Sequence, residues 1–133
     1  YCGIWQAEVG RYLDFEPIEN EIVRLCNDYS ILEVCYDVTQ LHDMATRLRK
    51  QGINTKVFSQ QQARLVADKD LQADIMARRV AHDGNPVLRQ HIDNADIKKS
   101  SEGIRIVKRS QSLKVDGAVG LSMGRARLNY FNV

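Results

Sequence analysis

Two aspartates, Asp37 and Asp116, are the residues of this sequence best suited to chemistry, although they lie 79 residues apart. Asp37 follows an apolar run that ends at Tyr36, and Asp116 follows Val115 and opens a stretch of small residues. Two carboxylates that converge can hold Mg²⁺ or Mn²⁺, and such ions activate water and stabilise phosphoryl displacement. Each aspartate alone also fits a plainer role, as a cap or a first-turn residue of a helix.

The segments around Asp37 predict an α/β layer. Residues 31–36 form a near-continuous apolar run, which is typical of a buried parallel strand. Residues 39–51 carry apolar residues at helical spacing, with Thr39 as the expected cap and Gly52 as the stop. Residues 53–58 read as a second strand, so we expect two parallel neighbours joined by a helical crossover.

The remaining segments predict helices and one hairpin. We expect a helix that begins at Glu16-Pro17, a long helix over 60–81 with a break near Asp68, a short helix capped by Asn85, a hairpin over 96–109 with its turn at 100–103, and a last helix from Val115 or Asp116. The chain of 133 residues fits a single domain over 1–133.

Composition limits the possible classes of protein. No apolar stretch is long enough for a membrane span, and no signal peptide is evident. The odd number of cysteines, with Cys26 and Cys35 among apolar residues, indicates buried thiols rather than a disulfide framework or a zinc site. Residues 64–133 hold 13 Lys and Arg against 8 Asp and Glu, a net charge of +5. This asymmetry suits a polyanionic partner or a solvated basic face.

Several motifs, taken in order, resemble the nuclease domain of phage terminase large subunits. No single motif is strong, and the resemblance depends on their order and spacing over most of the chain. They are Gly10 to Tyr29, Glu33-Val34-Cys35-Tyr36-Asp37, Leu48 to Val57, His82-Asp83-Gly84-Asn85-Pro86-Val87-Leu88, Lys108-Arg109-Ser110 and Lys114-Val115-Asp116-Gly117-Ala118-Val119. Asp83 stands where the family has a glycine.

The resemblance implies a fold similar to ribonuclease H, a mixed sheet flanked by helices. It implies a two-metal DNA endonuclease that uses Mg²⁺ or Mn²⁺, and it places two of the family's acidic positions on Asp37 and Asp116. A further family aspartate on a first strand has no counterpart, since Asp14 lies in a different context; we therefore expect a chain truncated at its N-terminus. The implied partners are double-stranded DNA, an ATPase domain, the small terminase subunit and the portal, in the cytoplasm of a bacterial host.

Five other residues are weaker candidates. Lys108, Arg109 and Lys114 are expected to contact DNA phosphates, or else to form solvated surface. His82 and Asn85 are possible cleft residues, although a helix-end dipole partner and a helix cap are the plainer alternatives. Two other readings of the whole chain stay open: a non-catalytic DNA-binding or packaging remnant of a prophage terminase, and an unrelated α/β domain.

Overall fold

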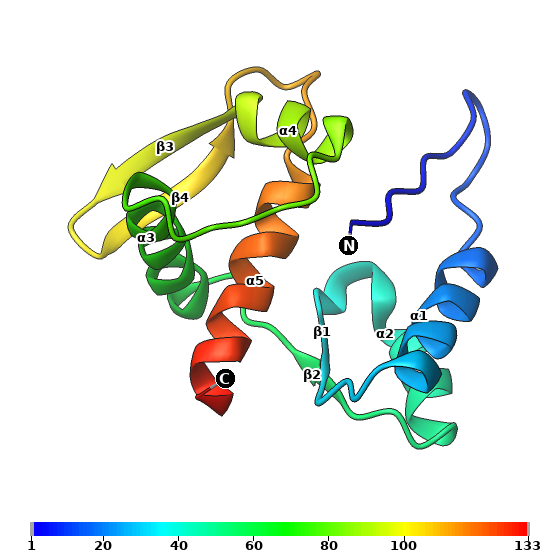
Figure 1. The fold of residues 1–133 in the computed structure, drawn as a ribbon. Helices are drawn as coiled ribbons and strands as arrows, with labels where there is room; N and C mark the ends of the chain where they lie inside the picture. The colour runs from blue at the N-terminus through cyan, green and yellow to red at the C-terminus, as the bar shows by residue number, and fades with distance from the viewer. Residues whose placement is uncertain (1, 133) are drawn as a thin grey trace. The chain divides into compact units, whose positions relative to one another are not determined.

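The computed structural model describes residues 2–132. Helices and strands alternate at first, and a hairpin between helices follows (Figure 1). The elements in chain order are α1 (Glu16–Asp28), β1 (Val34–Tyr36), α2 (Val38–Lys50), β2 (Thr55–Val57), α3 (Gln62–Met76), α4 (Pro86–Asp93), β3 (Ala95–Ser100), β4 (Gly103–Lys108) and α5 (Asp116–Phe131). They fall into two compact units, one of residues 5–58 and one of residues 59–133 together with 1–4.

The unit of residues 5–58 contains the expected parallel strand pair. β1 pairs with β2 in parallel, with Val34 opposite Thr55 and Tyr36 opposite Val57. α2 is the crossover between them and contacts β2, while α1 packs against α2. The predicted strand–helix–strand order and the parallel pairing are confirmed, although both strands are shorter than the predicted ranges.

Local chemistry explains where the helices of this unit begin and end. Pro17 lies in the first turn of α1, where its missing N–H costs nothing, and the carboxylate of Asp14 accepts the amide of Glu16 at 3.0 Å. The predicted stop at Gly52 is confirmed, because this glycine adopts a φ of +82° two residues after the last residue of α2. The cap of α2 is Asp37 rather than Thr39, whose own amide is the group that needs an acceptor.

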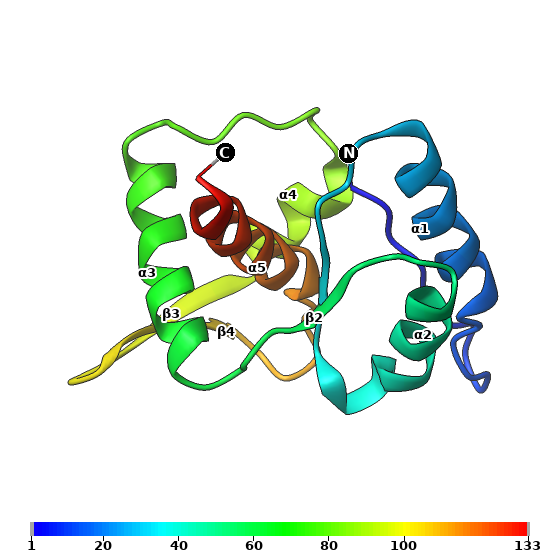
Figure 2. The same ribbon diagram turned by 90° about the horizontal axis from the view of Figure 1, so that it is seen from below.

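The other unit is built around α3. Figure 2 shows α5 beside α3, and β4 of the hairpin packs against the same helix. α4 packs against α5. Apolar residues with little exposed surface fill these contacts: Ala67, Leu71, Leu88, Ala118 and Met123.

Several predictions for this unit are confirmed. Asn85 caps α4, the hairpin turns between Ser100 and Gly103, and α5 begins at Asp116. The predicted break in α3 is wrong, since the helix runs without interruption through Asp68, whose carboxylate has partners on other elements. α3 also ends earlier than predicted: Arg78 adopts a φ of +55° two residues after Met76.

The sheet differs from the expected single mixed one. β1–β2 and β3–β4 form two separate two-stranded sheets, so the described strands do not share one continuous ladder. The structure is α/β in composition, and the single domain over 1–133 stays a prediction. No helix in the described part of the chain is long and apolar enough to cross a membrane.

The cysteines differ in burial from the prediction. Cys2, Cys26 and Cys35 are not joined by a disulfide, as expected, but all three are half-buried rather than fully buried. α1 has no fully buried residue, so Cys26 on that helix stays partly open to solvent. Its burial still raises the pKa of the Cys26 thiol.

Candidate active site

Asp37 stands at the junction of β1 and α2. Its Oδ1 accepts hydrogen bonds from the amide of Thr39 at 3.0 Å and from the Thr39 hydroxyl at 2.9 Å. The structural role is therefore confirmed: Asp37 is the N-cap of α2. Both bonds go to Oδ1, so capping does not use Oδ2, and the half-buried carboxylate keeps an oxygen for a ligand.

Asp116 is the first residue of α5, and its side chain is exposed. The residue before it, Val115, provides no side-chain cap and is itself buried, at 5% exposed. The helix dipole favours a negative charge at this end of α5. The structure thus holds the backbone at Asp116 through a buried neighbour while leaving the carboxylate accessible.

Asp37 and Asp116 belong to different compact units. Their convergence on one metal site therefore remains a prediction. Within the described part of each unit, no group of three or more His, Cys, Asp or Glu side chains is placed to hold a metal ion. The two carboxylates do suit Mg²⁺ or Mn²⁺ in chemical kind, because these hard cations prefer oxygen ligands.

Two residues that the sequence did not single out secure the chain on both sides of Asp116. His91 on α4 accepts the amide of Gly117 at Nδ1, with 2.9 Å between the two nitrogens. Asn94, directly after α4, donates from Nδ2 to the carbonyl oxygen of Lys114 at 3.0 Å. The sequence carries little signal for these contacts, since they join residues 26 and 20 positions apart.

The weaker cleft candidates have local structural roles. Asn85 accepts the amides of Val87 and Leu88 at Oδ1, and its Nδ2 donates to the carbonyl oxygen of Cys2 at 3.2 Å. His82 is exposed and accepts the amide of Gly84 at Nδ1. It lies six residues beyond the end of α3, so it is not the helix-end dipole partner considered above. A cleft role for either residue stays a prediction.

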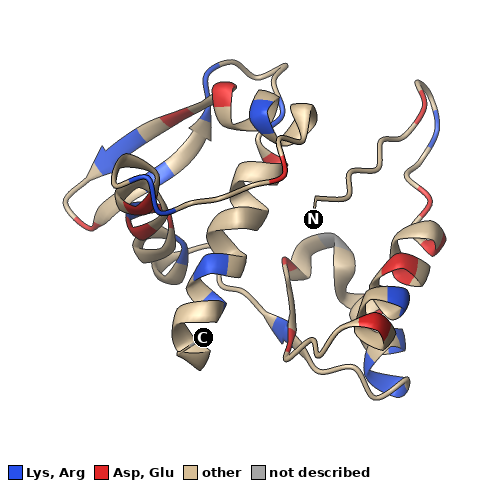
Figure 3. Cartoon of the chain, viewed as in Figure 1, with Lys and Arg blue, Asp and Glu red and all other residues tan. Residues whose placement is uncertain are grey.

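The three basic candidates lie on the segment that leads from the hairpin to Asp116. Lys108 ends β4, Arg109 follows it, and Lys114 precedes α5 by two residues; all three are exposed. Arg109 also has a structural contact, since its Nε donates to the carbonyl oxygen of Ala95 at 3.0 Å. Figure 3 shows basic residues along the hairpin and its connection to α5. The exposed side chains give this part of the unit a positive surface that suits a phosphate backbone.

The comparison with protein families shows which family the chain belongs to. Residues 4–129 match the family described as terminase large subunit, endonuclease domain. The match covers nearly the whole chain and both compact units, so the chain belongs to this family, as the order of its motifs predicted. Membership gives it a nuclease role in phage DNA packaging. No curated protein and no solved structure matches the chain.

Proposed function

We propose that this chain supplies the catalytic carboxylates of a metal-dependent endonuclease that cuts double-stranded DNA during phage genome packaging. Asp37 and Asp116 would hold Mg²⁺ or Mn²⁺. The observation that carries the proposal is the family match over residues 4–129. Two carboxylates at the starts of α2 and α5, half-buried Asp37 and exposed Asp116, support it, since they lie in the motifs that resemble the family's acidic motifs.

The architecture proposed for the assembled domain is similar to ribonuclease H, and the chemistry is that of a two-metal nuclease. Bound divalent ions would supply Lewis acidity, which activates water and neutralises charge at the scissile phosphate. The chain's own residues bind and orient the substrate: Lys108, Arg109 and Lys114 would hold the DNA backbone beside Asp116. An ATPase domain, the small terminase subunit and the portal are the proposed partners, in the cytoplasm of a bacterial host.

A plasmid-cleavage assay tests the proposal. The chain is incubated with supercoiled plasmid and Mn²⁺ or Mg²⁺, with and without a chelator, and compared with Asp37→Asn and Asp116→Asn. We expect both variants to fall to the rate of the chelated sample. Two matched controls, Asp43→Asn on α2 and Asp93→Asn on α4, remove exposed carboxylates from the same two units and should cut like the unmodified chain.

A second function has one observation in its favour, namely that neither unit contains a three-residue metal cluster among its described residues. In that case the chain binds DNA without cutting it. DNA binding with no metal-dependent cleavage by the chain would support this alternative and overturn the nuclease proposal. Cleavage that both aspartate variants retain would overturn the assignment of Asp37 and Asp116.

A further inference from the structure

α4 and the residue after it hold the segment that carries Asp116 from both sides. His91 takes the amide of Gly117, one residue after Asp116, and Asn94 holds the carbonyl of Lys114, two residues before it. His91 and Asn94 are three residues apart, so both can face the same neighbour. Between the two anchored peptide groups, Val115 is buried.

The bond to His91 satisfies a backbone group that would otherwise lack a partner. The first amides of a helix have no acceptor within the helix, and Val115 supplies no side-chain cap to α5. The acceptor at Nδ1 must be the unprotonated ring nitrogen, so the imidazole carries its proton on Nε2. The side chain of His91 is 5% exposed, and this burial fixes the ring in place.

The size of Gly117 belongs to the same arrangement. A Cβ atom at this position would lie 3.0 Å from His91 Nδ1 and 3.2 Å from Leu88 Cδ1. Only glycine lets α4 approach the backbone this closely without displacement of the imidazole. The Asp-Gly pair at the start of α5 therefore combines an exposed carboxylate with the backbone group that anchors it.

We propose that His91 and Asn94 are positioning residues for the Asp116 carboxylate. They act through the backbone, because they hold the peptide groups on either side of Asp116 in one conformation. This conformation fixes the direction in which the Asp116 carboxylate points. The inference depends on the proposed function, in which Asp116 binds the metal. Ligands that are held in place lose less entropy on binding, so removal of an anchor should weaken metal binding.

Mn²⁺ binding to the whole chain, measured from the electron-spin resonance of the free ion, tests the inference together with amide exchange at Gly117. His91→Leu removes the acceptor at similar volume, and Asn94→Ala removes the donor. We expect each to raise the half-saturating Mn²⁺ concentration about 3- to 10-fold. His91→Leu should also speed exchange of the Gly117 amide. His91→Asn places Oδ1 where Nδ1 was and should restore both measurements to within about 2-fold.

Ser122→Ala is the matched control for stability. It loses a buried hydrogen bond to α3 six residues after Asp116 and does not contact the anchored peptide groups, so it should lower stability without a change in Mn²⁺ binding. The inference is overturned if His91→Leu and Asn94→Ala bind Mn²⁺ like the unmodified chain, or if His91→Asn fails to restore binding. Asp116→Asn separates the two hypotheses: if it leaves Mn²⁺ binding unchanged, the proposed function itself fails.

Discussion

The hydroxyl of Ser122 on α5 donates a hydrogen bond to the carboxylate of Asp68 on α3, and neither side chain has exposed surface. The same carboxylate accepts Nε of Arg64 at 2.8 Å and the backbone amide of Ile106 on β4 at 2.8 Å. One buried aspartate thus joins two helices and the open edge of the hairpin. Each of its partners satisfies part of a charge that would be costly to bury alone.

Asp68→Ala should be among the most destabilising changes in this unit. It leaves the guanidinium of Arg64, whose side chain is 8% exposed, without its carboxylate, and the loss of one partner of a buried ion pair costs about 3–5 kcal/mol. Ser122→Ala removes one hydrogen bond and should cost about 0.5–1.5 kcal/mol. Urea unfolding measures both changes. A cost for Asp68→Ala no larger than that for Ser122→Ala would show that the ion pair contributes nothing.

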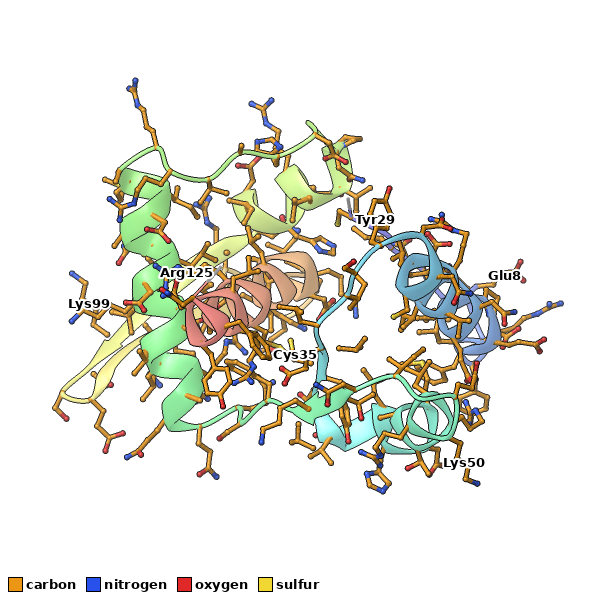
Figure 4. The ribbon with its side chains drawn as sticks, turned by 60° about the horizontal axis from the view of Figure 1, so that its bottom comes forward. Glu8, Tyr29, Cys35, Lys50, Lys99 and Arg125 are labelled. Atoms are coloured by element: carbon orange, nitrogen blue, oxygen red, sulfur yellow. The ribbon has the colours of Figure 1, made fainter. Side chains whose placement is uncertain are left out.

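Asp74 makes the stability of the fold depend on pH in the acidic range. Arg125 on α5 donates to one oxygen of this carboxylate, and Arg79 donates to the other at 2.6 and 2.9 Å; Figure 4 labels Arg125 between α3 and α5. The hydrogen bond from Arg125 and then those from Arg79 lower the pKa of Asp74 in the folded chain. In the unfolded chain the pKa of an aspartate is about 3.9, so the unfolded state takes up the proton before the folded state does as the pH falls.

The stability that the ionised Asp74 carboxylate contributes is therefore fully present above its pKa in the unfolded chain. That stability is lost as the pH falls through its lower pKa in the folded chain. We expect Asp74→Asn to flatten the loss of stability between about pH 5 and pH 2. Arg125→Ala removes the largest cause of the shift and should flatten it as well. Urea midpoints measured across this pH range test both variants. The prediction would be contradicted if the urea midpoints of the variants fell with pH as steeply as those of the unmodified chain.

The sequence predicted those elements whose cause is local. β1, α2 and β2 follow from apolar runs and from Gly52, and the cap at Asn85 follows from its place before Pro86. α3 is different, because polar residues share its buried face with Ala67 and Leu71. Arg64, Asp68 and Asp74 are buried there, while Met76 on the same helix is 79% exposed. An aspartate in mid-helix normally competes with the helical backbone, so the sequence alone favoured a break at Asp68.

The candidate site, too, has features that the sequence predicts and features that it does not. The position of Asp37 after a strand and of Asp116 at the start of a helix could be predicted from neighbouring residues. The anchors His91 and Asn94 could not, because their partners are distant in sequence and the partner groups are backbone atoms that every residue shares. The sequence indicated only that Gly117 starts a stretch of small residues; the close approach of His91 gives the physical reason for a glycine there.

DNA binding should be electrostatic and depend on the segment before Asp116. Lys108→Gln and Lys114→Gln each remove an exposed charge. Each should make the negative slope of log K against log salt shallower by about 0.9 and weaken binding to unrelated duplexes equally. Fluorescence anisotropy with two duplexes of different sequence tests this. Lys50→Gln, at the exposed end of α2 labelled in Figure 4, is the control and should leave the slope unchanged. Salt-insensitive binding, or equal slopes for all variants, would refute the prediction.

The two roles of Asp37 can be separated by substitution. Asparagine caps helices about as well as aspartate, so Asp37→Asn should retain stability but lose the negative charge that a metal requires. Asp37→Ala should lose both the charge and about 1 kcal/mol of stability. Thermal unfolding and Mn²⁺-dependent plasmid cleavage measure the two properties on the same samples. Full cleavage by Asp37→Asn would leave Asp37 with its capping role alone.

Alanine substitutions at the three glycines of α5 should not all change the stability of the fold in the same direction. Gly120 and Gly124 have nothing within 4 Å of an added Cβ, whereas Gly117 has His91 Nδ1 at 3.0 Å and Leu88 Cδ1 at 3.2 Å. Alanine at either open position gains helix propensity and restricts the unfolded chain, so Gly120→Ala and Gly124→Ala should each stabilise the fold by about 0.5–1 kcal/mol. Gly117→Ala should destabilise it by about 1–3 kcal/mol, because α4 must move to admit the methyl group.

The sign of the Gly117→Ala change is the critical result. An added methyl group meets no neighbouring atom at Gly120 or Gly124, so a destabilising effect confined to Gly117→Ala would report the close approach of α4. Urea unfolding of the three single variants gives the comparison, and amide exchange at residue 117 reports whether the bond to His91 is lost. If Gly117→Ala stabilises the chain as much as Gly120→Ala, α4 does not hold the start of α5 as closely as the structure indicates, and the anchoring of Asp116 by His91 is wrong.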